Sequence, residues 1–152
     1  MTRKEQAMAY FKEGYNCSQA VFLTFCDITG YEKSEAAKLS APFGGGFGRQ
    51  REVCGAVSGM CLVIGHFFGS DDPADHEAKA KIYERTQEVC ATFRERFGSI
   101  ICRELLSRDE ASSTTPTPSA RTEAYYKKRP CAEIVGEAAE IVEAYLLAHG
   151  KL

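Results

Sequence analysis

The chain has 152 residues, of which 44% are hydrophobic and 26% are charged, and its formal net charge is −2. This length suits one globular domain that buries a core without disulfides or metals, and the slightly acidic balance argues against nucleic acid or an anionic membrane as the main partner. The longest apolar run, residues 60–68, is about half of the ~20 residues that a membrane span requires. We find no export signal at the N-terminus, so a cytoplasmic protein is expected.

Helical periodicity dominates the chain, and no segment shows the alternation typical of a strand. In chain order, we expect helices over about residues 2–14, 16–30, 34–41, 53–68, 72–97, 99–108 and 130–149. Residues 108–128 are rich in Ser, Thr and Pro and are expected to form a flexible loop. The predicted fold is therefore all-α, a single-domain bundle of six to seven helices spanning residues 1–152.

Several helix starts carry local capping signals. Thr2 followed by Glu5 predicts a capping box, and Asn16 is a favourable N-cap for the second helix. Asp72 followed by Pro73 predicts the start of the fifth helix, because proline suits the first helical position.

The stretch GGGFGRQREVCGAVSG, residues 44–59, raises the question of a phosphate-binding loop. A dinucleotide fingerprint needs a preceding strand, and a phosphate loop of the Walker type needs Gly-Lys-Ser/Thr. Neither is present, so nucleotide binding is not expected. The glycines are better suited to turning the chain sharply into the next helix. Arg49 and Arg51 add positive potential near the following cysteine or are simply solvated, and the sequence leaves both interpretations open.

Small residues follow Cys54 in the same stretch. Gly55, Ala56 and Gly59 would let another backbone or a cofactor approach the first turns of this helix closely. We therefore count these three residues, together with Arg49, as candidate cofactor-binding positions. Tight helix packing is the alternative explanation for the small side chains.

Seven cysteines are many for this length, and their number is odd. Without an export signal, metal binding or thiol redox chemistry is a stronger interpretation than a disulfide scaffold. Four of them fall in the first turn of an expected helix, on its inward face: Cys17, Cys54, Cys102 and Cys131. The other three are expected in the core: Cys26, Cys61 and Cys90. Whether Cys61 joins the site stays open, because it lies two turns from Cys54 on the same face.

The first turn of a helix favours a thiolate, because its N–H groups are unpaired and its dipole presents positive charge. In an up-and-down helical protein, alternate helices begin at the same end. The four helix-start thiols are therefore expected to meet in the interior at one end of the bundle.

The segments NCSQAVF, VCGAVSG, ICRELL and RPCAEIV together resemble the family named for the pattern C-GCAxxG-C-C, also described by a CGAxxG motif. The resemblance covers roughly residues 5–147, although Val53 stands where the family label writes glycine before cysteine. It implies a redox-active protein whose four family cysteines are Cys17, Cys54, Cys102 and Cys131. A related domain occurs in a multihaem cytochrome of the split-Soret type, to which an iron–sulfur centre has been attributed. The resemblance therefore implies a [2Fe–2S] site here.

Three functions remain open at this point, and the first of them is the one that we expect. The first is an electron carrier or oxidoreductase whose four cysteines bind an iron–sulfur cluster. The second is a cofactor-free oxidoreductase that cycles pairs of these cysteines between dithiol and disulfide. The third is a non-enzymatic module with a structural zinc site of four sulfurs. The redox partner is unknown, and the apolar helix faces make a homodimer a further expectation.

Overall fold

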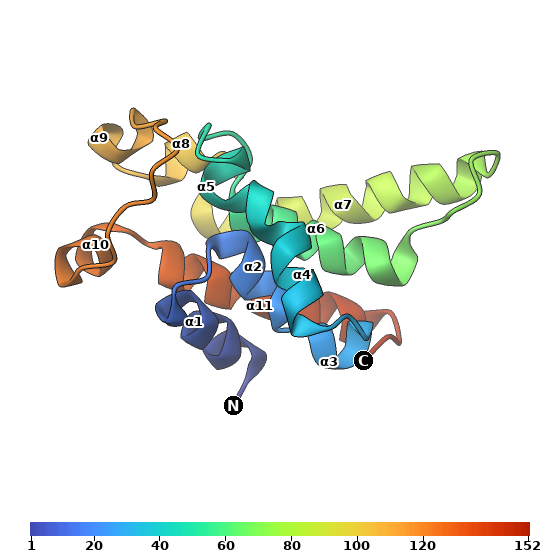
Figure 1. The fold of residues 1–152 in the computed structure, drawn as a ribbon. Helices are drawn as coiled ribbons and strands as arrows, with labels where there is room; N and C mark the ends of the chain where they lie inside the picture. Colours follow the sequence, from blue (N-terminus) through green and yellow to red (C-terminus); the bar gives the residue numbers. More distant parts are fainter.

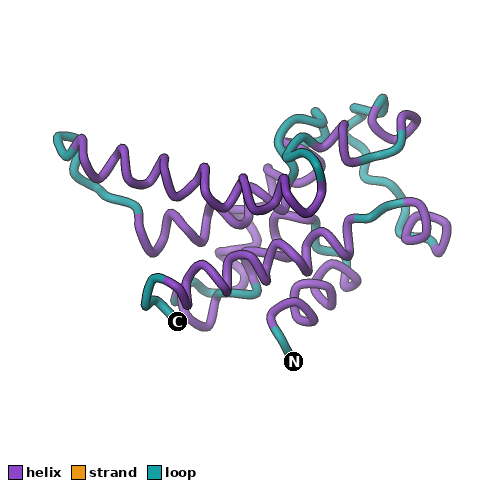
Figure 2. The backbone as a smooth tube through the Cα atoms, turned by 180° about the vertical axis from the view of Figure 1, so that it is seen from behind, coloured by secondary structure: helices purple, strands orange, loops and turns teal.

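The computed structural model describes residues 1–152, with the side chains of all positions except 127 and 128. Helices make up 69% of the chain, and the described residues form no strand, which confirms the all-α prediction (Figure 2). The helices are α1 (Arg3–Glu13), α2 (Cys17–Leu23), α3 (Cys26–Thr29), α4 (Lys33–Ser40), a short 3-10 helix η1 (Ala41–Phe43), α5 (Gly44–Phe47), α6 (Gly55–Phe68), α7 (His76–Phe97), α8 (Cys102–Leu105), α9 (Arg108–Ala111), α10 (Glu123–Lys128) and α11 (Cys131–Ala148).

The core lies between α1, α2, α6 and α11. Helix α1 packs along α11, and α2 packs along α6, so segments from both ends of the chain share one interior (Figure 1). Val21, Met60 and Val135 are fully buried there. Helices α6 and α7 leave the core as a long hairpin, and the ends of the two helices that the connecting loop joins extend away from this body (Figure 1). No described helix is long and apolar enough to cross a membrane.

The capping signals at the first two helices act as predicted. Thr2 and Glu5 form the reciprocal capping box of α1. At α2, the Gln19 backbone N–H donates to Asn16 Oδ1 at 3.0 Å, and the Asn16 backbone N–H donates to the Gln19 side chain at 2.9 Å. Asn16 Nδ2 also donates to the carbonyl of Ala41 at 3.0 Å, which ties the start of α2 to η1. These bonds fix the backbone directly before Cys17.

We expect Asn16→Ala to lower the free energy of unfolding by about 1 kcal/mol, because it removes an N-cap. Asn16→Asp is the matched control, since it keeps the acceptor for the Gln19 N–H and loses only the donor to Ala41. Urea denaturation of both variants measures the difference. A loss in Asn16→Asp as large as that in Asn16→Ala would mean that the Ala41 contact, not the cap, carries the effect.

The predicted helix over residues 16–30 is interrupted between α2 and α3. Thr24 Oγ1 donates to the carbonyl of Ala20 at 2.9 Å, a back-bond that often bends helices. The Phe25 N–H then bonds to Phe22, three residues back, instead of four. The chain therefore turns here and restarts as α3.

The predicted start at Asp72 is wrong. Asp72 Oδ1 accepts from the N–H of Ala74 at 3.0 Å, and its carbonyl accepts from Asp75 at 3.1 Å, so Asp72 and Pro73 form a turn. Helix α7 begins only at His76. Its N-cap is Asp75, whose side chain accepts from the N–H of Ala78 at 2.9 Å.

Two helices lie within residues 108–128, where a loop was predicted. Helix α9 stands at the beginning of this segment and α10 at its end, and residues 113–121 connect them without helix. The side chains at 127 and 128 lie outside the described part. Thr122 explains the start of α10, because its side chain accepts from the N–H of Tyr125.

Candidate functional site

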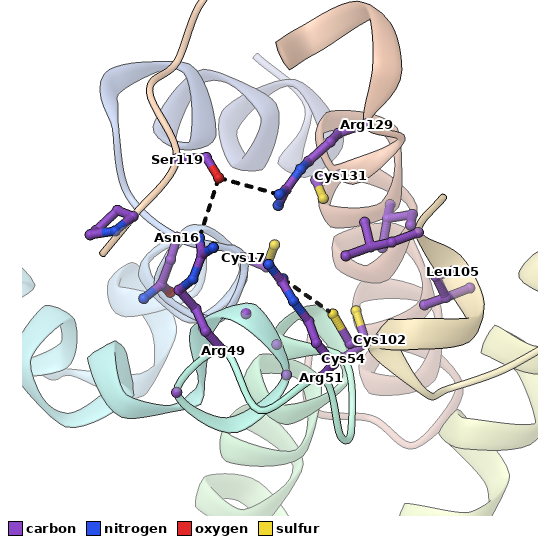
Figure 3. A pocket seen from close by; sticks show the side chains of 18 of the residues that line it. Asn16, Cys17, Arg49, Arg51, Cys54, Cys102, Leu105, Ser119, Arg129 and Cys131 are labelled. Carbon is purple, nitrogen blue, oxygen red and sulfur yellow. Dashed lines mark hydrogen bonds between the residues drawn. The ribbon is translucent and has the colours of Figure 1, made fainter. Parts of the chain in front are cut away.

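The four helix-start cysteines line one cavity of about 420 Å³ (Figure 3). Three of them are the first residues of α2, α8 and α11, and the fourth is the N-cap of α6. The structure thus brings together Cys17, Cys54, Cys102 and Cys131. All seven cysteines of the chain are free thiols.

An isolated antiparallel bridge places Cys54 beside Cys102. The bridge pairs Val53 with Ile101. The Cys54 N–H donates to the carbonyl of Ile100 at 2.8 Å, and the Cys102 N–H donates to that of Glu52 at 2.6 Å. Side chains alternate along extended backbone, so the two cysteines lie on the same side of the bridge as diagonal neighbours. The extended backbone also explains why α6 and α8 begin later than predicted.

Gly55 allows the start of α6 to lie against the start of α2. A Cβ at this position would stand 3.2 Å from the Cβ of Cys17 and 3.0 Å from the carbonyl oxygen of Phe43. One turn further on, a Cβ at Gly59 would come within 2.9 Å of Val21. Gly55 lines the cavity, whereas Gly59 and the fully buried Ala56 serve the packing of α6 against the core.

Cys17 and Cys131 both line the cavity, and a hydrogen bond between their thiols shifts the pKa of each. This bond, with help from the positive charges of Arg129 and Arg121, lowers the pKa of Cys131 from its ordinary value despite its burial. The same bond, followed by burial of the thiol, raises the pKa of Cys17 well above its usual range. Cys131 is therefore the thiolate-forming member of the pair.

Burial dominates at the other two cysteines. It raises the pKa of Cys54 to about 12, although backbone N–H groups at Ala56 and Val57 act in the opposite direction. It also raises the pKa of Cys102, against the lowering effect of Arg51. The expectation that all four helix starts favour a thiolate is thus corrected, because desolvation outweighs the backbone N–H groups at Cys54 and the Arg51 cation at Cys102.

Four arginines surround the thiols. Arg49, Arg51, Arg121 and Arg129 all line the cavity, and its described lining contains no Asp or Glu. Arg51 is only 2% exposed, and its Nη1 donates to the Cys102 sulfur at 3.8 Å. The sequence pointed to Arg49 and Arg51 through their place in the glycine-rich stretch. Arg129 stands two residues before Cys131, which is a signal that sequence reasoning missed. Nothing in the sequence marks Arg121.

The remaining cysteines lie outside the cavity. Cys26 is partly exposed on α3. Cys61 on α6 donates a hydrogen bond to Cys90 on α7, and this bond lowers the pKa of Cys90 to about 7. Cys61 is not among the described residues that line the cavity, so the structure places it apart from the four.

The four thiols surround the cavity without converging on one point. Within the described part of the chain, no three His, Cys, Asp or Glu side chains are gathered closely enough to hold a metal ion. The donor set itself, four sulfurs with a buried cation beside them, is of the kind that binds iron–sulfur clusters or zinc. The residues therefore offer the donor atoms that such a group needs, but their sulfurs are not gathered as closely as the group requires.

One family comparison covers this site. The sequence profile of a family described as "Putative redox-active protein (C_GCAxxG_C_C)" matches residues 15–145, a span that includes all four cysteines of the cavity. Neither the curated proteins nor the solved structures gave a significant match. Because the profile covers most of the chain, the protein belongs to the C_GCAxxG_C_C family.

Proposed function

We propose that this protein is a thiol oxidoreductase in which Cys17 and Cys131 cycle between dithiol and disulfide. The observation that carries this proposal is that both thiols line one cavity together with four arginines. Because the thiolate is the nucleophile in thiol–disulfide exchange, a lowered pKa at one member of a close pair is what such a reaction requires.

The reaction balances with a disulfide, RS–SR, as the oxidant. The Cys131 thiolate attacks one sulfur of RS–SR, forms a mixed disulfide and releases RS⁻, which takes the proton of Cys17. The Cys17 thiolate then attacks the Cys131 sulfur, releases the second RS⁻ and closes the protein disulfide. The second RS⁻ takes up the proton that Cys131 had lost. Two electrons pass from the protein to RS–SR, giving two RSH.

Cys54 and Cys102 have a supporting part in this scheme. Their raised pKa values keep both thiols protonated near neutral pH. They lie beside the reacting pair without competing with Cys131 for the oxidant. Reduction of the protein disulfide by a partner dithiol would reverse the steps and restore the starting state.

An iron–sulfur cluster is the second candidate, favoured by the four thiols around a single cavity. Cys17, Cys54, Cys102 and Cys131 would hold it, and Arg51 would donate toward the Cys102 sulfur. A bound cluster supplies one-electron transfer. The thiols would have to close in on a common point, and a zinc site with Zn–S distances of about 2.3 Å would require the same movement.

Mild oxidation tests the dithiol proposal directly. When the reduced protein is treated under argon with an equimolar small disulfide, we expect the loss of two titratable thiols and a Cys17–Cys131 disulfide in peptide maps. The matched control is Cys26→Ser, which removes a thiol outside the cavity and should leave this disulfide unchanged.

The same preparation separates the candidates. Stoichiometric iron and sulfide with charge-transfer absorption in the anaerobically purified protein would replace the dithiol proposal by the cluster, and stoichiometric redox-silent zinc would replace it by the structural site. Metal-free protein that keeps all its thiols after the disulfide treatment would contradict the dithiol proposal.

A further inference from the structure

Arg51 is a buried cation with unused hydrogen-bonding capacity in the cavity. Its Nε donates to the carbonyl of Ser113 at 3.0 Å, and its Nη1 to the Cys102 sulfur at 3.8 Å. Its Nη2 is buried and has no hydrogen-bond partner among the described residues. An unsatisfied buried donor on a charged group is costly, so its presence calls for a ligand. Figure 3 shows the guanidinium between Cys17 and Cys102, facing the space that the thiols surround.

Three of the four arginines that line the cavity have no described carboxylate as an ion-pair partner. Arg129 pairs with Glu110. Arg49 donates to the carbonyl of Thr115 at 2.7 Å and Arg121 to those of Phe11 and Tyr15. These acceptors, like the Ser113 carbonyl that Arg51 contacts, are neutral carbonyl oxygens. They accept hydrogen bonds from the guanidinium groups but do not neutralise their positive charge.

Repulsion between these cations affects the pKa of Arg49. Its pKa is lowered by burial and by the positive charges of Arg51 and Arg129. The backbone is strained at Arg49 and Arg51, because their φ angles of 66° and 62° lie in the left-handed region that residues with a side chain disfavour. The loop therefore holds two residues in a strained backbone conformation, and both of their cationic side chains line the cavity.

We propose that the cavity binds the negatively charged group of a small disulfide substrate, a carboxylate or another oxyanion, with Arg51 as its main contact. This inference deepens the proposed dithiol function by giving it a substrate class. Arginine presents paired N–H donors that match carboxylate and oxyanion geometry. A cavity of about 420 Å³ lies in the range that small-molecule sites occupy. The bound anion would supply the missing partner of Nη2 and hold the disulfide beside Cys131.

Two aryl disulfides that differ in charge provide the test. Dithiobis-nitrobenzoate carries two carboxylates, and dithiodipyridine is neutral at pH values near neutrality. We expect the ratio of their rate constants, each normalised to a small reference thiol, to fall about tenfold to a hundredfold in Arg51→Met, the effect of losing a charge-assisted hydrogen bond. The ratio for Arg51→Lys should lie between those of the wild type and Arg51→Met. Arg96→Met, which removes a surface cation outside the cavity, should retain the wild-type ratio within about twofold.

Inorganic phosphate gives a second readout. At constant ionic strength set with sodium chloride, phosphate should slow the dicarboxylate and leave the neutral disulfide unaffected. If Arg51→Met slows both disulfides equally, Arg51 serves the thiols and the anion proposal is overturned. If Arg51→Met is unfolded by circular dichroism, Arg49→Met takes its place, with a smaller drop expected in the same ratio.

Failure of the dithiol function can be distinguished from failure of the anion site. If neither disulfide reacts faster than the reference thiol, the dithiol function fails, and calorimetry with inorganic phosphate then decides the anion site. Binding to the wild type that weakens in Arg51→Met supports the site, and equal or absent binding in both proteins overturns it.

Discussion

Replacing Cys131 with serine is expected to prevent the disulfide in the cavity completely and to remove its fastest-reacting thiol. Serine retains the size of cysteine and lacks a nucleophilic thiolate, so no mixed disulfide can form at this position. Alkylation with iodoacetamide followed by peptide mapping measures the reaction at each cysteine separately. The mapping is needed because Cys90, outside the cavity, also has a lowered pKa, of about 7.

Replacing Cys17 with alanine tests the cause of the low pKa at Cys131. The hydrogen bond from Cys17 stabilises the Cys131 thiolate and lowers its pKa. Loss of this hydrogen bond raises the pKa of Cys131, so the fraction of Cys131 present as thiolate falls at a given pH. The alkylation rate of Cys131 plotted against pH should therefore shift toward higher pH in Cys17→Ala.

Cys26→Ser is the control for this shift, since Cys26 lies on α3 away from the cavity. It should leave the pH profile of Cys131 unchanged. An unchanged profile in Cys17→Ala, or a shift toward lower pH, would mean that the arginines alone set the acidity of Cys131.

Gly46→Ala is expected to lower the free energy of unfolding by about 2–5 kcal/mol. Its φ angle of +74° costs an L-residue about 1–2 kcal/mol. A Cβ there would also stand 2.6 Å from the Cβ of Cys102 and 2.9 Å from the backbone of Arg51 and Glu52, which overpacks the site by about 1–3 kcal/mol more. Urea denaturation measures the total loss.

Gly98→Ala separates the two contributions. Gly98 has a φ of +87° and no described atom within 4 Å of a Cβ, so only the backbone cost of about 1–2 kcal/mol should remain. Equal losses in the two variants would show that the loop yields around Cys102 without cost. The alkylation rate of Cys102 in Gly46→Ala reports the accompanying displacement of its side chain.

Local signals explain the part of the fold that was predicted. The Thr2–Glu5 box, the Asn16 cap and Pro130 before Cys131 act within one helical turn, so the sequence alone places three of the helix starts within a residue. The same locality explains the errors. Asp72 has the composition of an N-cap, but its side chain and carbonyl are used in a turn that precedes Asp75.

The sequence by itself determined the helical class, the family and the identity of the four cysteines at helix starts, because periodicity, caps and motifs are properties of neighbouring residues. Only the tertiary structure decided that Cys54 and Cys102 meet across a two-residue bridge and that Cys61 lies outside their cavity. It also decided which thiol is acidic, since burial, the Cys17 hydrogen bond and Arg129 act on Cys131 from different elements. Desolvation and charge depend on what surrounds a group in space, and distant segments supply those surroundings.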